Sequence, residues 1–154
     1  MLDFDFEPEA PTWSKRVAAF DLETTGLDLA TARIVTACVA VLDSAGEVEV
    51  LHEFWVNPGI DIPQSASDVH GVTTEMASLN GMAPEIAIAQ ITAILSELQV
   101  AMPLVAFNAP YDFTILVNEA KRYQIEPLQP LPRSDLLVIL LKCYQESALG
   151  LIIR

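Results

Sequence analysis

Alternation of apolar and polar residues predicts three strands in the first third of the chain. Apolar side chains dominate residues 16–23, 34–42 and 47–56. Residues 43–46, Asp-Ser-Ala-Gly, are typical of a turn between neighbouring antiparallel strands. In the third segment polar and apolar positions alternate, so we expect one face of that strand to be wet or lightly covered.

A longer period follows in the second half. Residues 84–98 carry apolar side chains every three or four positions, which predicts an amphipathic helix packed on the sheet. A short apolar strand at 104–107 and a helix at 111–123 come next, and the prolines at 127, 130 and 132 predict a loop. A helical crossover would make the fourth strand parallel to a neighbour. The pattern indicates an α/β fold with a mixed sheet.

Composition indicates a globular domain with an excess of acidic residues. With 154 residues and 52% apolar content, the chain is long enough to bury a core. Its net charge of -13 has the wrong sign for gripping a phosphate backbone by counterion release. We divide the chain into an acidic N-terminal arm at 1–13, a domain core at 14–133, and an atypical apolar C-terminal tail at 134–154.

The cysteine spacing and the lengths of the apolar runs indicate in which cellular compartment we expect the protein. Cys38 and Cys143 have no metal-ligand or redox spacing, which favours small buried hydrophobic roles. No signal-peptide pattern begins the chain. The longest aliphatic run, residues 136–141, is far shorter than the ~20 residues that span a bilayer, and we expect it to be buried as a helix or to form a dimer interface. A cytoplasmic protein without membrane contact is expected.

Asp21 and Glu23 lie two positions apart on an otherwise apolar strand, so they share one face. Two like charges held this close repel unless a cation lies between them, which points to a hard divalent metal. An edge strand carrying solvated acids before a turn would show the same short motif, so Asp-x-Glu alone does not decide between the two.

Asp112 is the second candidate. Pro110 suits the first turn of the helix that follows the 104–107 strand, which places Asp112 in that turn, at the mouth of the strand. An acid there also complements the helix dipole without any catalytic role.

Together, the motif at 21–26 (Asp-Leu-Glu-Thr-Thr-Gly) and the turn holding Asn108 and Asp112 resemble the first two motifs of the DEDD superfamily of 3′-to-5′ exonucleases. Residues 57–63 and 69–73 resemble the connecting stretch of the proofreading epsilon subunits of bacterial DNA polymerase III, a His-subtype group. The resemblance covers roughly residues 16–127. It implies a ribonuclease H-like fold with three antiparallel strands, then a parallel strand reached through a crossover helix.

The resemblance also implies a mechanism and a site. Phosphodiester hydrolysis would use two Mg²⁺ or Mn²⁺ ions, with the second site weak. The catalytic and metal-binding residues would be Asp21, Glu23 and Asp112. The implied contacts to the terminal nucleotide are the backbone around Leu22, Thr24 and Thr25, the ring of Phe107, and His70, with Asn108 close to the metals. A lone loop His such as His70 is often only a surface residue. The implied partners are the single-stranded 3′ end of DNA, with RNA possible, and a DNA polymerase subunit.

One part of the family pattern is missing. The third motif supplies a His and, five residues on, an Asp, both after the second motif. The chain has no histidine beyond His70, and its only later acids are Glu119, Glu126, Asp135 and Glu146. We therefore expect a C-terminally incomplete, truncated exonuclease fold of reduced activity.

Three alternatives remain open. A dimer partner could supply the missing His and Asp, an impaired remnant could bind metal and a 3′ end without turnover, or the chain could be a polymerase-docking module that keeps only the fold.

Overall fold

A four-stranded mixed sheet forms the centre of the protein, whose computed structural model describes residues 15–129. The strands lie in the order β3-β2-β1-β4. The first three are antiparallel neighbours, and β4 runs parallel to β1, as the sequence predicted. Their bounds are β1 Arg16–Thr24, β2 Ile34–Asp43, β3 Val48–Trp55 and β4 Leu104–Val105.

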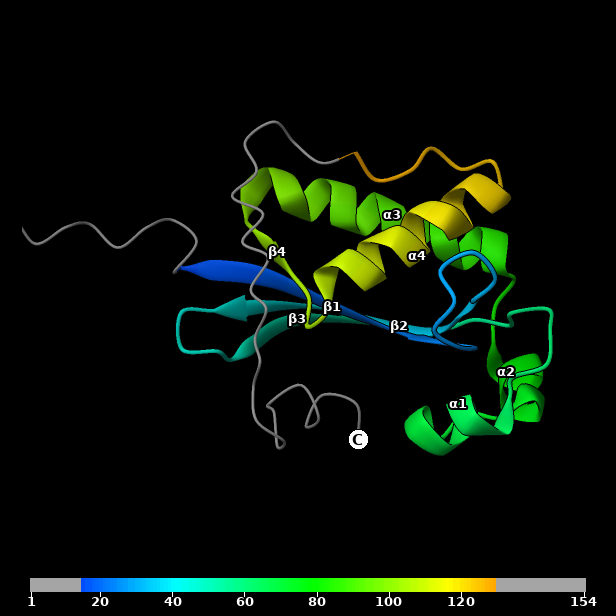
Figure 1. Ribbon diagram of the computed structural model, residues 1–154. Coiled ribbons are helices and arrows are strands. Elements are labelled where there is room, and N and C mark those ends of the chain that lie inside the picture. Colours follow the sequence, from blue (N-terminus) through cyan, green and yellow to red (C-terminus); the bar gives the residue numbers. More distant parts are fainter. Residues whose placement is uncertain (1–14, 130–154) are drawn as a thin grey trace, which may run out of the picture.

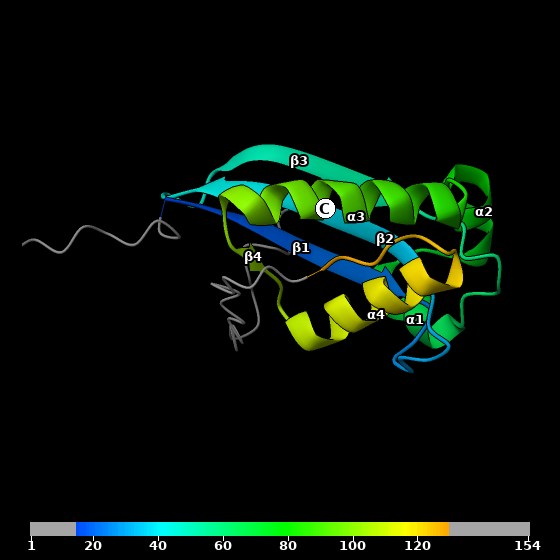
Figure 2. The same ribbon diagram turned by 90° about the horizontal axis from the view of Figure 1, so that it is seen from above.

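Four helices flank the sheet: α1 Gln64–His70, α2 Thr74–Asn80, α3 Pro84–Ala101 and α4 Ala109–Arg122. Figures 1 and 2 show α3 and α4 covering one face, while α1 and α2 lie at one end of the sheet, away from that face. Among the described residues, no helix is long and apolar enough to cross a membrane.

The main core lies between the sheet and the two long helices. Even-numbered β1 residues such as Phe20 and Leu22 point into it, which confirms the predicted alternation along β1. From α3 the contributors are Ile88, Ile91 and Leu95, and from α4 Ile115 and Leu116. The opposite face of the sheet is thereby left to the odd-numbered residues, including Asp21 and Glu23.

The two short helices α1 and α2 were not predicted. The sequence indicated only a connecting stretch with His70 in a loop, whereas His70 is the last residue of α1. Each helix has only seven residues, too few to show a helical period. Gly71, in the left-handed region at φ 78°, ends α1, and the Thr73 side chain caps α2.

Two strand expectations also need correction. β3 is exposed along most of its length on both faces, not one, because it is the edge strand and the long helices lie over β1 and β2. β4 has only two residues instead of four, because the chain turns into α4 at once. The proposed arm and tail, including residues 136–141 and Cys143, lie outside the described residues.

Candidate active site

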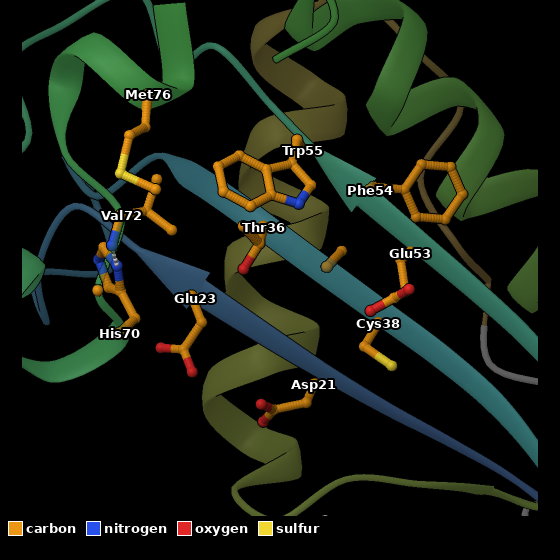
Figure 3. Close-up of a pocket in the computed structure, with 12 residues that line it drawn as sticks. Asp21, Glu23, Thr36, Cys38, Glu53, Phe54, Trp55, His70, Val72 and Met76 are labelled. Atoms are coloured by element: carbon orange, nitrogen blue, oxygen red, sulfur yellow. Dashed lines mark hydrogen bonds between the residues drawn. The ribbon is translucent and has the colours of Figure 1, made fainter. Parts of the chain in front are cut away.

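Strand β1 carries Asp21 and Glu23 on the face that α3 and α4 leave open. Both line a cavity of ≈ 300 Å³ that extends across β2 to β3 and to the α1 and α2 region (Figure 3). That volume is at the lower end of the range for small-ligand sites. The strand therefore presents both carboxylates to a ligand-sized space, as their spacing predicted.

Asp112 reaches the same strand from its edge. Its Oδ1 accepts a hydrogen bond of 3.2 Å from the backbone N–H of Leu22, the residue between the two β1 acids. That N–H needs a partner because β4 pairs with β1 only at Ala18 and Ala19. The short β4 thus leaves an opening that Asp112, in the first turn of α4, fills.

The three carboxylates share one electrostatic environment. Burial raises the pKa of Asp21, and burial together with the Asp21 charge raises the pKa of Glu23. Burial and then the charges of Asp21 and Glu23 raise the pKa of Asp112 to about 7. No Lys or Arg is among the described residues that line the cavity with Asp21 and Glu23. Asp112 does not line the cavity, and no basic side chain lowers the pKa of any of the three acids.

The donor chemistry fits a hard divalent cation, since the three groups offer only carboxylate oxygens. Their side chains are not gathered around one point, however: among residues 15–129 no three His, Cys, Asp or Glu side chains stand close enough to hold an ion. The candidate site therefore consists of carboxylates that repel one another near the end of β1, and they do not form a complete metal-coordination shell.

The loop after β1 uses its own hydroxyls for structure. The Tyr111 hydroxyl donates to the Gly26 carbonyl at 2.6 Å and lies 2.8 Å from Thr24 Oγ1. Thr25 Oγ1 accepts from the Arg33 N–H at 3.0 Å. The Leu22 side chain is in the core. The side chains of Leu22, Thr24 and Thr25 therefore serve the core and the loop, and of the implied backbone contacts the Leu22 amide is already bonded to Asp112.

His70 lines the cavity, whereas Phe107 and Asn108 do not. Its Nδ1 accepts from the Val72 N–H at 3.2 Å, and its buried Nε2 has no hydrogen-bond partner among the described residues. Burial lowers the pKa of His70, an effect that the nearby Thr24 backbone partly offsets, so the neutral ring is favoured. Phe107 is half exposed at the turn before α4, and Asn108 is the exposed residue that precedes the helix.

Cavity residues on β2 and β3 were missed by sequence reasoning. Cys38 lies opposite Asp21, and Glu53 lies opposite Cys38. Burial, with Glu53 and Asp21 nearby, raises the pKa of the Cys38 thiol to about 11, which fits the expected unreactive, buried cysteine. Strand alternation could have put these residues on one face, but only the register shows which of them are neighbours.

Glu119 was also missed as a structural group. It is fully buried, accepts from Arg33 Nε at 3.0 Å, and forms a second ion pair with Arg122. Its spacing of seven residues from Asp112 puts both acids on one face of α4, a signal that was present in the sequence. These ion pairs take up the charge of Glu119, so it does not replace the missing acid of the third motif.

The mixed sheet of three antiparallel strands and one parallel strand, with its helices, matches a ribonuclease H-like fold. The chain belongs to the exonuclease family (RNase_T), whose sequence model matches residues 18–151. This membership confirms the predicted relation to the DEDD 3′-to-5′ exonucleases.

Relatives and solved structures agree with this assignment. The chain is 35% identical over 117 residues to a DNA polymerase III subunit epsilon-like protein of Rhodobacter capsulatus. The matched region covers 70% of the chain and 15% of that protein. Escherichia coli Exonuclease I bound to a dT13 oligonucleotide superposes with a TM-score of 0.64 at 20% identity, covering 73% of the chain and 25% of the enzyme. An apo Exonuclease I structure gives 0.65 at 20% identity, over 73% of the chain and 26% of that structure. The chain thus spans about a quarter or less of these proteins.

Proposed function

We propose that this chain is the nuclease domain of a 3′-to-5′ exonuclease of the DNA-proofreading type, which depends on divalent metal ions. The observation that carries the proposal is the hydrogen bond from the Leu22 N–H to Asp112. It joins two segments about ninety residues apart and brings an acid of α4 to the amide between Asp21 and Glu23. Family membership supports the reaction class, and exonucleases of this kind depend on divalent metals.

Asp21, Glu23 and Asp112 would hold Mg²⁺ or Mn²⁺, the ions that suit carboxylate oxygens. When bound, such ions activate a water molecule and stabilise the leaving 3′ oxygen. Asp21 and Glu23 are held by β1, so they would orient a bound ion and, through it, a substrate phosphate. Burial and the neighbouring acids raise the pKa of Asp112 to about 7, so the ionised form that would bind a metal is favoured only above that pH in the metal-free protein.

We propose that these 154 residues, assayed alone, have reduced activity. No histidine follows Asp112 to act as general base, and Glu119 is engaged by Arg33 and Arg122. A positioned general base contributes at least about a hundredfold in rate. The same lack favours a second candidate function: an impaired domain that binds metal and a 3′ end, or docks on a polymerase, without efficient turnover.

The proposed substrate is the single-stranded 3′ end of DNA, with RNA possible. A solved neighbour of the fold holds a dT13 oligonucleotide, and the relative from Rhodobacter capsulatus is described as epsilon-like, which supports a polymerase subunit as partner. We further propose that the chain divides into an arm at 1–13, a nuclease core at 14–133 and a tail at 134–154. We also propose a cytoplasmic location, and a dimer in which the partner would supply the missing His and Asp.

Release of 3′ nucleotides from a single-stranded oligonucleotide in Mn²⁺ tests the proposal. We expect a rate at least about a hundredfold below that of a complete relative, the low end of what losing a general base costs. The residual release should disappear in Asp21→Asn and Asp112→Asn. Glu97→Gln is the matched control, because it removes one exposed charge from α3, on the covered side of the sheet.

Two results would contradict the proposal. Release that survives Asp21→Asn would show that the hydrolysis comes from another site or a contaminant. Release near ~10 per second that depends on Asp112 would refute the reduced-activity part, because it would show a complete catalytic site.

A further inference from the structure

We propose that the outer edge of β3 binds an extended, basic segment of another protein, which adds a strand to the sheet. Strand β3 is the last strand on its side of the sheet, and Figure 2 shows it along the border of the ribbon. An edge strand presents N–H and C=O groups that can pair with another chain. This surface is separate from the proposed reaction and does not depend on it.

Strand register shows which backbone groups of β3 face outward. The N–H of Val56, the residue after β3, donates to the Val35 carbonyl of β2 at 2.8 Å. Even-numbered residues of β3 therefore pair with β2, because the pairing direction alternates along a strand. The N–H and C=O groups of Leu51 and Glu53 consequently face outward, and no strand within residues 15–129 pairs with them.

One residue already occupies the end of this edge. The Met82 N–H donates to the Trp55 carbonyl at 2.9 Å, and the Asn57 N–H donates to the Met82 carbonyl at 3.0 Å. These two bonds form an isolated parallel bridge, so Met82 takes the position of a fifth strand. The outward groups of Leu51 and Glu53 continue the same edge, which is therefore suited to further strand pairing.

Apolar side chains are exposed on both faces of the edge. Val50 shares the face of Phe54, which lies in the core under the long helices, whereas Leu51 points to the open face. Val50 is 39% exposed and Leu51 is 43% exposed. A strand paired beside them would remove both side chains from water, which favours binding.

Charge argues against a second copy as the occupant. Glu49 and Glu53 are exposed along β3, and each molecule carries a net charge of -13. Arg16 pairs with Glu49, but Glu53 has no ion pair among the described residues. Two copies paired along this edge would bring the glutamates of both close together, and like charges across strands are destabilising.

A strand that alternates basic and apolar side chains fits the edge. A Lys or Arg opposite Glu53 would lie on the open face and form a favourable cross-strand pair. The next residue of the added strand would then point to the helix side, where an apolar side chain would cover Val50. The acidic surface as a whole would also attract a basic partner.

The probe is acetyl-Thr-Lys-Val-Thr-Val-Lys-Thr-amide, called here the basic peptide, and the readout is amide hydrogen–deuterium exchange in ¹⁵N-labelled protein. In the free protein we expect fast exchange at Leu51 and Glu53, which face outward. The amides of Val50 and His52 face β2 and should exchange slowly. At ten times its dissociation constant, the basic peptide should slow the two outward amides about tenfold, the factor 1 + [L]/Kd, and leave the two inward amides unchanged.

N-methylated peptides test strand pairing without changing the protein. With a Lys opposite Glu53, the central Thr lies opposite Leu51 and its N–H faces β3. Methylation of that Thr nitrogen should abolish the protection. Methylation of a Val nitrogen, which faces away from β3, is the matched control and should preserve it.

A charge reversal tests the choice of partner. Glu53→Lys should weaken binding of the basic peptide about fivefold, the upper part of what a cross-strand charge pair contributes. The same variant should bind the acidic peptide, in which Glu replaces each Lys, more tightly than the basic one. Glu97→Lys makes the same change in net charge on α3 and should change neither affinity. Slow exchange at Val50 and His52 shows that each variant is folded.

The alternating protection, lost with the methylated Thr and kept with the methylated Val, supports the added strand. Leu51 and Glu53 amides that stay fast at every peptide concentration overturn it, and so does equal protection by the acidic peptide. Protection of these two amides that rises with protein concentration alone overturns the basic partner, because it assigns the edge to a second copy.

Discussion

Asp112 is the side chain on which most of the site depends. It is only 3% exposed, it accepts the Leu22 N–H, and it lies beside two further acids. A buried carboxylate without a cationic partner favours its neutral form. Its role in the folded protein therefore changes with pH.

The pKa of Asp112 predicts the sign of a stability change. The pKa is 3.8 in the unfolded chain and about 7 in the folded one. Between these values the folded state binds more protons, so this contribution to stability is fully present below about pH 4 and is lost as pH rises to about 7. Asp112→Asn keeps an oxygen for the Leu22 N–H and removes the titration.

Urea unfolding in EDTA at several pH values measures this effect. We expect Asp112→Asn to gain stability relative to the parent protein between about pH 4 and pH 7, by on the order of 1–3 kcal/mol at the upper end. Glu97→Gln, an exposed charge change, should show no such trend. A difference between Asp112→Asn and the parent protein that stays constant with pH would contradict the raised pKa.

Some residue roles can be predicted from sequence and others cannot. The two-residue period of a strand predicts that Asp21 and Glu23 share a face, and Pro110 predicts that Asp112 lies in the first turn of a helix. Glu53 and Trp55 were missed because their proximity to β1 depends on the register of two strand pairs. Local sequence does not contain that register.

At the scale of elements, α4 connects the parts of the site. Its first turn supplies Tyr111 to the loop after β1 and Asp112 to β1 itself. Its last turns bind the segment at 28–34. The Asn118 side chain donates to the Leu29 carbonyl, and the Arg122 side chain donates to the Ala30 carbonyl. Glu119 accepts from the Arg33 side chain. Helix α4 thus fixes both ends of the loop that follows the two β1 acids.

Substitution of Glu119 tests whether the last turns of α4 stabilise the loop after β1. Removing one partner of a buried ion pair leaves the other charge uncompensated, so Glu119→Ala should lower the free energy of unfolding by about 3–5 kcal/mol. Arg33 and Arg122 are partly exposed, which should place the loss nearer the lower value. The urea midpoint provides the measurement, and Glu97→Gln on the exposed side of α3 is the control.

A change below about 0.5 kcal/mol, the range of ordinary surface substitutions, would contradict the structural role of Glu119. It would mean that Arg33 and Arg122 find other partners without cost. Helix α4 would then be held by its apolar contacts alone.

The elements themselves were largely predictable. Long strands and long helices show their periods clearly, so β1, β2, α3 and α4 were predicted within a few residues. The two seven-residue helices and the two-residue β4 are set by capping and by tertiary contacts, which a window of sequence does not show.

At the scale of the whole molecule, charge restricts how nucleic acid can bind. Of the five basic residues within 15–129, Arg16, Arg33 and Arg122 are held in ion pairs with Glu49 and Glu119. With a net charge of -13, the protein has little to offer a phosphate backbone over a wide surface. The proposed binding of a 3′ end at one point, through a cation at the acidic site, fits this charge distribution.

The central claim is that two distant segments form one divalent-metal site at the end of β1. Titration of the metal-free protein with Mn²⁺, followed by electron paramagnetic resonance of the free ion, measures it most directly. We predict one site that fills first and depends on Asp21, a second that is much weaker, and loss of the first site in Asp21→Ala. Mn²⁺ binding at the first site that is unchanged in Asp21→Ala, or unchanged in Asp112→Ala, would contradict the account.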